Sequence, residues 1–209
     1  MSEEIVASFA QSSDVADIVD FLLKDFVIRE SLTNAIHTKP EEIRSFISYL
    51  TEKGVKSGTS VVLRNEKGEV VGTRLSSFLE RDHAEDGDEN TVFHPKAGLI
   101  GQLLDRVSGN KWSLVPNDVN KLFYIIIISV SSSYGRRGLG KLVIEYGMDE
   151  VRKEGAQGFI AEATAMNSQM LGYDVLKTVR HEDYVDGDGK RIFNCTDGTQ
   201  AAELVFKRM

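Results

Sequence analysis

The chain has 209 residues, 41% of them hydrophobic and 27% charged, as in a globular protein with its own core. The net charge of -7 argues against a general nucleic-acid binder, which needs clustered lysine and arginine. The longest apolar run, residues 122–128, is too short to cross a bilayer, and the lone Cys195 excludes an internal disulfide framework. The N-terminus lacks the basic and apolar regions of a signal peptide. We therefore expect one cytoplasmic domain over residues 1–209, with no nucleic-acid or membrane partner.

The first half of the chain alternates between strand and helix patterns. We predict a strand at residues 5–10, a helix at 15–29, a helix at 40–54 and a hairpin of strands at 60–64 and 70–79. Asp14 is the predicted N-cap of the first helix, and Glu30 lies just beyond its end.

The second half continues the alternation around an acidic segment, residues 81–96, which we expect to be a surface loop. We predict a helix at 97–107, irregular chain at 110–120, strands at 122–130 and 158–165, a helical piece at 167–172, and strands at 176–184 and 202–207. The fold class is therefore mixed α/β within one domain.

The centre of the chain is a strand, a glycine-rich loop and a helix in direct succession. Residues 122–130 are nearly all β-branched or aromatic, which is typical of a strand buried on both faces. The loop contains Gly135, Gly138 and Gly140, and apolar residues recur at helical spacing from there to about residue 153. A helix N-terminus presents free N–H groups and about half a positive charge, so this unit predicts a phosphate site.

By spacing alone, residues 135–141 match the phosphate-binding loop of nucleoside triphosphatases, G-x-x-x-x-G-K. That loop continues with Ser or Thr, whose hydroxyl binds magnesium, whereas this chain has Leu142. Losing the metal ligand removes the chemistry, so we set this interpretation aside.

Residues 129–142 read Ser-Val-Ser-Ser-Ser-Tyr-Gly-Arg-Arg-Gly-Leu-Gly-Lys-Leu. They resemble the acetyl-CoA-binding motif of the GCN5-related N-acetyltransferases, [Gln/Arg]-x-x-Gly-x-[Gly/Ala]. Gly138 and Gly140 fall on the two small positions, while Gly135 takes the Gln/Arg position beside Arg136. The resemblance implies a central, mostly antiparallel mixed sheet, flanked by helices and splayed at the cofactor site. It also implies acetyl-CoA as co-substrate and no metal.

The segment 21–32 is similar to the part of the invertebrate arylalkylamine N-acetyltransferases that carries their Asp-Glu-Pro-Leu element. Glu30 and Leu32 match it, whereas Arg29 and Ser31 replace the Asp and the Pro. Residues 161–173 are also similar, but the helix after Ser168 is about one turn shorter than in the family.

The resemblance implies roles for particular residues. Those expected to bind the cofactor are Ser129, Val130, Arg136, Arg137, Gly138, Leu139, Gly140 and Lys141. Glu30 is the expected general base, because an alkylamine must lose a proton before it attacks a thioester. The departing thiolate would receive a proton from Ser168 or Tyr173. These residues also have purely structural interpretations: Glu30 is a carboxylate beyond a helix end, and Ser168 is a helix N-cap.

The expected function is acetyl transfer from acetyl-CoA to a small primary amine, in particular an arylalkylamine. Two alternatives stay open: an inactive regulatory module that binds acetyl-CoA, and an acetyltransferase for a polyamine or a protein amine. The histidines show no metal-ligand spacing; they are His37, His83, His94 and His181.

Overall fold

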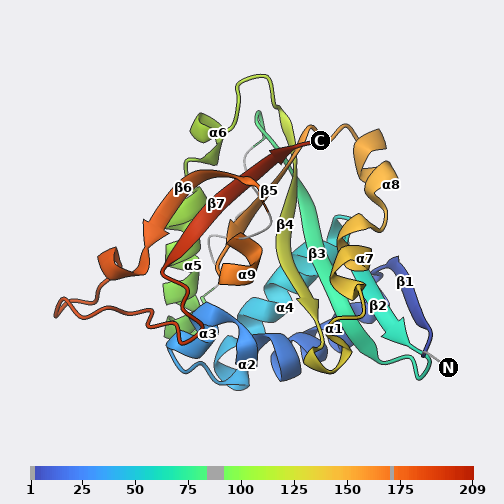
Figure 1. Ribbon diagram of the computed structural model, residues 1–209, viewed down its shortest axis with the longest axis horizontal. Coiled ribbons are helices and arrows are strands. Elements are labelled where there is room, and N and C mark those ends of the chain that lie inside the picture. Colours follow the sequence, from blue (N-terminus) through green and yellow to red (C-terminus); the bar gives the residue numbers. More distant parts are fainter. Residues whose placement is uncertain (1–2, 84–91, 170–171) are drawn as a thin grey trace.

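A seven-stranded sheet runs through the molecule in the order β1-β2-β3-β4-β5-β7-β6 (Figure 1). This computed structural model describes residues 3–83, 92–169 and 172–209. The strands are β1 (Ile5–Phe9), β2 (Val61–Asn65), β3 (Val70–Glu80), β4 (Lys121–Val130), β5 (Gly158–Ala163), β6 (Asp174–Arg180) and β7 (Ala201–Arg208). Neighbouring strands are antiparallel except for β4 and β5, which are parallel. The predicted mixed, mostly antiparallel sheet is confirmed.

Helices cover both faces of the sheet. They are α1 (Val15–Phe21), α2 (Val27–Arg29), α3 (Ser31–Ala35), α4 (Pro40–Lys56), α5 (Pro95–Ser108), α6 (Lys111–Leu114), α7 (Leu139–Glu145), α8 (Met148–Lys153) and α9 (Met166–Gln169). The main core joins α1, α4 and α5 to one face, and two smaller apolar clusters lie under α7 and α8 on the other (Figure 1). Among the described residues, no helix is long and apolar enough to cross a membrane.

The parallel strands β4 and β5 separate about halfway along β4. They pair from Leu122 with Gly158 to Ile125 with Ala161, and β4 then continues to Val130 paired with β3 but not with β5. A bulge at this point shifts the pairing of β4 with β3, because Leu75 faces Ile127 while Ser76 faces Ile125. The second half of β4 therefore presents an open edge toward β5, as the predicted splay requires.

The predicted helix at 15–29 forms, but with an interruption. A π-helical turn, η2 (Leu22–Phe26), separates α1 from α2. Such turns are rare and are often found at functional sites. Asp14 occupies the predicted N-cap position of α1, but its side chain makes no cap hydrogen bond there. Its carboxylate instead accepts the N–H of Gln11 at 2.8 Å, within the capping box of the preceding 3₁₀ turn.

The predicted single helix from residue 139 to about 153 is also wrong. The chain breaks into α7 and α8 at Tyr146 and Gly147, where Tyr146 is extended (ψ 129°) and Gly147 has φ 72°. A Cβ on Gly147 would lie 2.4 Å from Cζ of Phe9 on β1, so the tertiary packing here requires a glycine.

Smaller differences concern the connections. Residues 110–120, expected to be irregular, contain α6, and the strand expected at 176–184 ends at Arg180 and continues as a 3₁₀ turn. Part of the expected acidic loop, residues 84–91, lies outside the described residues, as do residues 170–171.

Candidate active site

The parting of β4 and β5 opens a cavity of about 450 Å³. Its walls come from residues 125–130 of β4, residues 161–165 on β5 and just after it, and the junction of α2 with α3. Glu30, Ser168 and Tyr173 all line it, although they lie on separate parts of the chain. The fold thus gathers the expected catalytic residues at one place, beside the open edge of β4.

Glu30 lies between α2 and α3 and is the N-cap of α3. Its Oε2 accepts the N–H of Thr33 at 2.8 Å, and its Oε1 accepts the hydroxyl of Thr164 at 2.9 Å. Burial raises the pKa of the Glu30 carboxyl above its usual value, and these hydrogen bonds oppose the rise. The capping and catalytic interpretations are therefore compatible, because one carboxylate caps a helix and faces the cavity.

A second, smaller cavity of about 80 Å³ adjoins the first. The residues that line both cavities are Phe26, Glu30, Ile126, Ile127, Glu162 and Thr164. The rest of the smaller cavity is largely apolar, lined by Leu32, Ile43, Phe46, Ile47, Leu50, Ile100 and Leu104 among others. An amine at Glu30 could place an apolar body in this pocket.

Glu162 on β5 is a site residue that the sequence analysis missed. Its Oε2 accepts the hydroxyl of Tyr124 at 2.8 Å, and burial raises the pKa of its carboxyl. The Ser108 hydroxyl and the Lys111 charge partly oppose that rise. The available signal was the alternation of β5, since Glu162 and Thr164 are two residues apart and both line the two cavities.

Asp197 also lines the larger cavity and was not predicted. It accepts hydrogen bonds from the hydroxyls of Ser31 at 2.6 Å and Thr199 at 2.9 Å. Among the described lining residues, Glu30, Glu162 and Asp197 are acidic and Arg29 is the basic one. Three carboxylates against one guanidinium suit a cationic ligand.

The two expected proton donors differ in their surroundings. The Ser168 hydroxyl donates to the carbonyl of Ala165 at 2.7 Å and accepts the N–H of the same residue at 3.3 Å. Burial raises the pKa of the Tyr173 hydroxyl, and its ring lies 5.5 Å from Nζ of Lys207. Ser168 thus has its proton engaged by the backbone.

Ser129 and Val130 lie at the end of β4, beside the cavity. Ser129 is 5% exposed, and its Oγ has no hydrogen-bond partner among the residues that the structure describes. The N–H of Ser131 donates to Val71 on β3, so by alternation the polar groups of Val130 face the open edge. These two residues therefore offer an unused hydroxyl and a strand edge to a ligand.

The loop after β4 turns through two left-handed residues, Arg136 (φ 61°) and Gly138 (φ 76°). The first bond of α7 runs from the N–H of Leu142 to the carbonyl of Gly138 at 3.1 Å, so the preceding amides have no acceptor in the helix. A Cβ on Gly138 or Gly140 would meet nothing within 4 Å.

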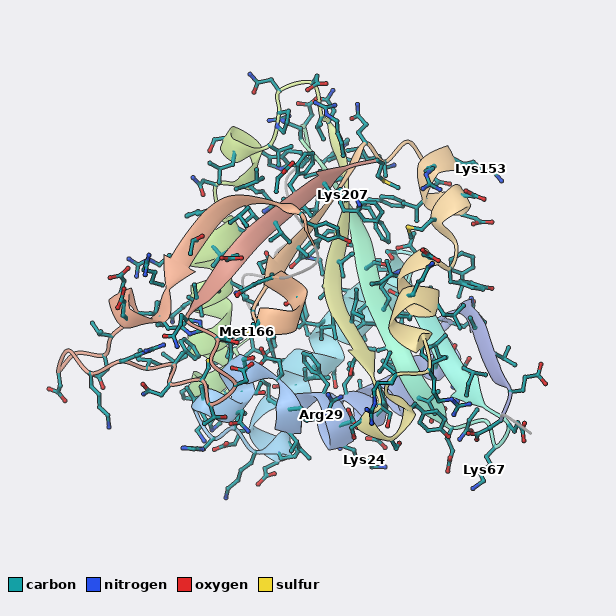
Figure 2. The ribbon with its side chains drawn as sticks, in the orientation of Figure 1. Lys24, Arg29, Lys67, Lys153, Met166 and Lys207 are labelled. Atoms are coloured by element: carbon teal, nitrogen blue, oxygen red, sulfur yellow. The ribbon has the colours of Figure 1, made fainter. Side chains whose placement is uncertain are left out.

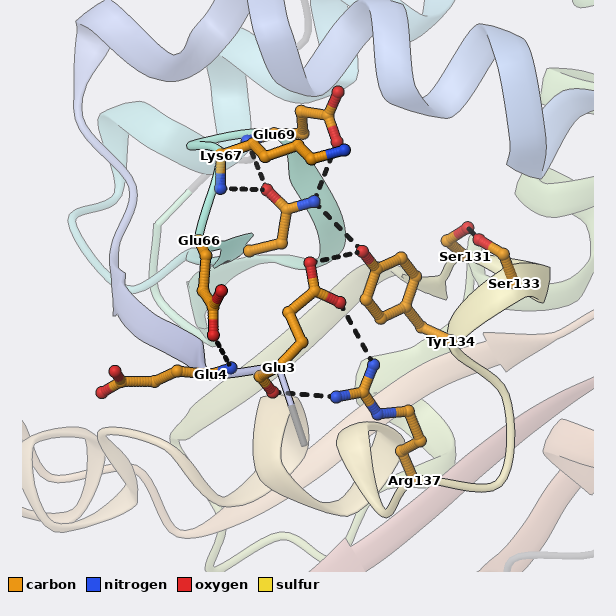
Figure 3. A network of polar contacts seen from close by, with 10 residues as sticks. Glu3, Glu4, Glu66, Lys67, Glu69, Ser131, Ser133, Tyr134 and Arg137 are labelled. Atoms are coloured by element: carbon orange, nitrogen blue, oxygen red, sulfur yellow. Dashed lines mark hydrogen bonds and ion pairs between the residues drawn. The ribbon is translucent and has the colours of Figure 1, made fainter. Parts of the chain in front are cut away.

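The side chains of the loop point in different directions. Leu139 is buried in the cluster under α7, whereas Arg136 and Lys141 are exposed. Arg137 turns toward the N-terminal segment: its Nη2 donates to the Glu3 carbonyl at 2.9 Å, and it lies over the Tyr134 ring (Figure 3). Its part in cofactor binding stays a prediction.

Asp25 and Arg29 connect the helical segment before Glu30 to this loop. The carboxylate of Asp25 accepts the N–H of Ser132 at 3.1 Å and pairs with Arg29. Arg29, on the segment that passes the end of β4 (Figure 2), donates to the Val130 carbonyl at 3.1 Å. The residues around Glu30 are thus tied to the start of the loop.

No group of three or more His, Cys, Asp or Glu residues in the described parts of the chain could hold a metal ion. The open edge of β4 and the amides that begin α7 suit an extended, anionic ligand, and the carboxylate of Glu30 in the cavity suits a cation.

Comparison with solved structures yields full-length likenesses. Arylalkylamine N-acetyltransferase 2 from Aedes aegypti is 22% identical, with a TM-score of 0.82 over 98% of this chain and 99% of that one. The polyamine N-acetyltransferase of Drosophila melanogaster is 21% identical, with a TM-score of 0.79 over 99% of this chain and 100% of that one. The C-terminal condensation domain of Ebony is 16% identical, with a TM-score of 0.73 over 100% of both chains.

No protein-family model and no curated protein sequence matches the chain. At these identities the likenesses show the fold, which is that of the GCN5-related N-acetyltransferases, as the loop motif predicted. One of the three similar structures is named for condensation, so the reaction must be argued from the site itself.

Proposed function

We propose that residues 1–209 form a single N-acetyltransferase domain that transfers the acetyl group of acetyl-CoA to a small primary amine. The observation that carries this proposal is the position of Glu30. The half-buried carboxylate of Glu30, whose pKa is raised by desolvation, lines the cavity that opens where β4 and β5 part. Acetyl transfer to an amine needs a base at that place.

The residues at the loop fit acetyl-CoA, which would supply the activated acetyl group. The unpartnered Ser129 hydroxyl and the open edge at Val130 suit the amide-bearing arm of the co-substrate. The amides that open α7, next to Gly138 and Gly140 with free space above them, suit its diphosphate. Arg136 in the loop and Lys141 in the first turn of α7 are exposed cations beside these amides.

The protein's own groups would then move two protons. Glu30 accepts a proton from the ammonium, directly or through a water, so that the nitrogen lone pair can attack. The Val130 N–H is available to stabilise charge on the carbonyl oxygen. When the C–S bond breaks, the hydroxyl of Tyr173 or Ser168 donates a proton to the departing thiolate sulfur, and the second proton of the acylated nitrogen replaces it on that hydroxyl.

Within this function, an arylalkylamine is the proposed acceptor. The apolar lining of the smaller cavity supports it, as does the sequence similarity around Glu30. A cavity of about 150 Å³ binds benzene, whereas this pocket measures about 80 Å³. An aromatic ring would therefore also use space in the adjoining larger cavity.

An aliphatic polyamine is the second candidate acceptor. The small pocket volume favours a narrow chain, and the carboxylates of Glu162 and Asp197 could hold further ammonium groups. The polyamine N-acetyltransferase of Drosophila melanogaster is one of the similar structures.

A steady-state assay with acetyl-CoA tests the proposal. The amine panel pairs phenethylamine and tyramine with agmatine and spermidine, and adds a peptide with a free N-terminus. Turnover of a small amine is the expected result. Calorimetric binding of coenzyme A without turnover of any amine would instead favour an inactive regulatory module.

A further inference from the structure

Arg74 is a fully buried arginine in the middle of β3, with 0% of its surface exposed. It lies on the face covered by α7 and α8, and its guanidinium is 5.1 Å from the centre of the Phe123 ring. No carboxylate among the described residues pairs with it. Burial lowers its pKa to about 10, so it keeps its positive charge at neutral pH.

The guanidinium binds backbone carbonyls at the point where α7 ends. Nη1 donates to the carbonyls of Val143 at 3.0 Å, Ile144 at 2.7 Å and Tyr146 at 3.0 Å. Nη2 donates to the carbonyl of Thr59 at 2.9 Å. Arg74 therefore joins the last turn of α7 to the strand region beneath it.

A buried charge without an ionic partner is unfavourable, and an apolar side chain of similar size would pack the same space. At this position the charge instead matches the negative end of a helix, where the last carbonyls lack partners of their own. The break at Tyr146 and Gly147 leaves these carbonyls free for Arg74. The arginine thus replaces the continuation of the helix that the sequence pattern predicts.

The other end of α7 follows the loop of residues 131–138. A seven-residue helix is only about 10 Å long, so the position of its C-terminal end largely determines the position of its N-terminal end. The loop is held at its start by Asp25, through the N–H of Ser132. Arg74 and Asp25 therefore hold the loop and helix at opposite ends.

We propose that Arg74 is a positioning residue for the acyl donor, which sets α7 so that the loop before it receives the diphosphate of acetyl-CoA. The inference rests on the proposed function, because it assumes that the diphosphate binds there. Arg74 itself touches neither substrate.

The test compares two donors in the wild type and in Arg74→Met. S-acetylpantetheine has the same thioester and arm as acetyl-CoA but lacks the diphosphate. We expect Arg74→Met to lower kcat/KM for acetyl-CoA by about tenfold or more, and for S-acetylpantetheine by less than about threefold. Equal losses with both donors, or no loss with either, would overturn the proposal.

Arg74→Lys is the second variant, because it keeps the charge and fills most of the space if Arg74→Met does not fold. Arg74→Lys should also lose more kcat/KM with acetyl-CoA than with S-acetylpantetheine, but by a smaller factor. Equal losses with the two donors would count against the proposal. Arg64→Met is the matched control. Arg64 on β2 pairs with Asp14 and Asp17, so its loss should lower Tm and leave the donor ratio unchanged.

Calorimetry separates this inference from the proposed function. Coenzyme A and pantetheine are titrated into each variant without any acceptor. If the wild type acetylates no amine, the proposed reaction fails, while a selective loss of coenzyme A binding in the Arg74 variants still supports the positioning role. An unchanged ratio of the two affinities would refute it.

Discussion

The hydroxyl of Thr164, directly after β5, donates a hydrogen bond to Oε1 of Glu30 at 2.9 Å, joining residues that are 134 positions apart in the chain. The bond spans the opening between the helical segment and the parted strands. It fixes the carboxylate at the place where the two cavities meet. An acid-base role for Glu30 therefore depends on a strand that forms late in the chain.

Glu30→Gln should lower kcat/KM for the preferred amine by about 10²- to 10⁴-fold, the usual contribution of a general base. Glutamine keeps the size of the side chain and an oxygen for the Thr33 N–H, so the cap of α3 survives. Glu42→Gln is the matched control, because Glu42 accepts the N–H of Lys39 at 2.8 Å at the start of α4, outside both cavities. Equal rates in the two variants would exclude Glu30 as the base.

The rate should depend on pH through the same carboxyl. Burial raises the pKa of Glu30 from the ordinary 4.5, so the base is protonated and inactive at low pH. We expect kcat/KM to rise with pH through a limb centred above 4.5, and this limb should be absent from the residual rate of Glu30→Gln. A profile shared by both enzymes would assign the limb to another group.

Thermal stability should show the opposite trend. A carboxyl whose pKa is raised in the folded state favours the fold while protonated, and that contribution is lost as pH rises through the raised pKa. Glu30→Gln cannot ionise, so its Tm relative to the wild type should increase as pH rises above 4.5. Differential scanning fluorimetry between about pH 4 and pH 8 measures the difference in Tm between the variant and the wild type. A constant offset would contradict the burial argument.

The proton donor can be identified by comparing two variants. Tyr173→Phe should lower kcat by about tenfold or more, while leaving KM for the amine little changed. Ser168→Ala should have the smaller effect on kcat, since the Ser168 proton already bonds to Ala165. The reverse order would identify Ser168 as the acid.

Glu162 should contribute to binding of the amine. Glu162→Gln removes one of the cavity's carboxylates, and we expect KM for the amine to rise about tenfold with KM for acetyl-CoA unchanged. Tyr124→Phe removes the 2.8 Å hydrogen bond that orients the Glu162 carboxylate, so the double variant should lose less than the sum of the two single effects. Additive losses would show that the two side chains act independently.

Local patterns were sufficient for much of the fold and for part of the site. The turn signal at residues 65–69 between two strand-like segments, the apolar run of β4 and the glycine spacing after it predict the hairpin and the loop, because these features depend on neighbouring residues. The position of Glu30 beyond a helix end was likewise predictable. The resemblance around the glycine loop then indicated which end of β4 borders the proposed cofactor site.

The missed features depend on residues far apart in the chain. Apolar residues continue at helical spacing through Tyr146 and Met148, so the sequence shows no break between α7 and α8. The break depends on Arg74 and Phe9, which lie on β3 and β1. Glu162 was missed because the face of β5 that borders the cavity depends on the pairing with β4.

Gly147 provides a quantitative test of this packing. Gly147→Ala should destabilise the protein by about 1–2 kcal/mol because the backbone is left-handed there. The close contact of the added Cβ with Phe9 should cost about 1–3 kcal/mol more. Gly155→Ala is the control, because Gly155 has φ 85° but nothing within 4 Å of the added Cβ, so it should show the backbone effect alone. Phe9→Leu combined with Gly147→Ala should recover part of the difference, measured by urea unfolding. If the two alanine variants are equally stable, the Phe9 contact does not explain the break between α7 and α8.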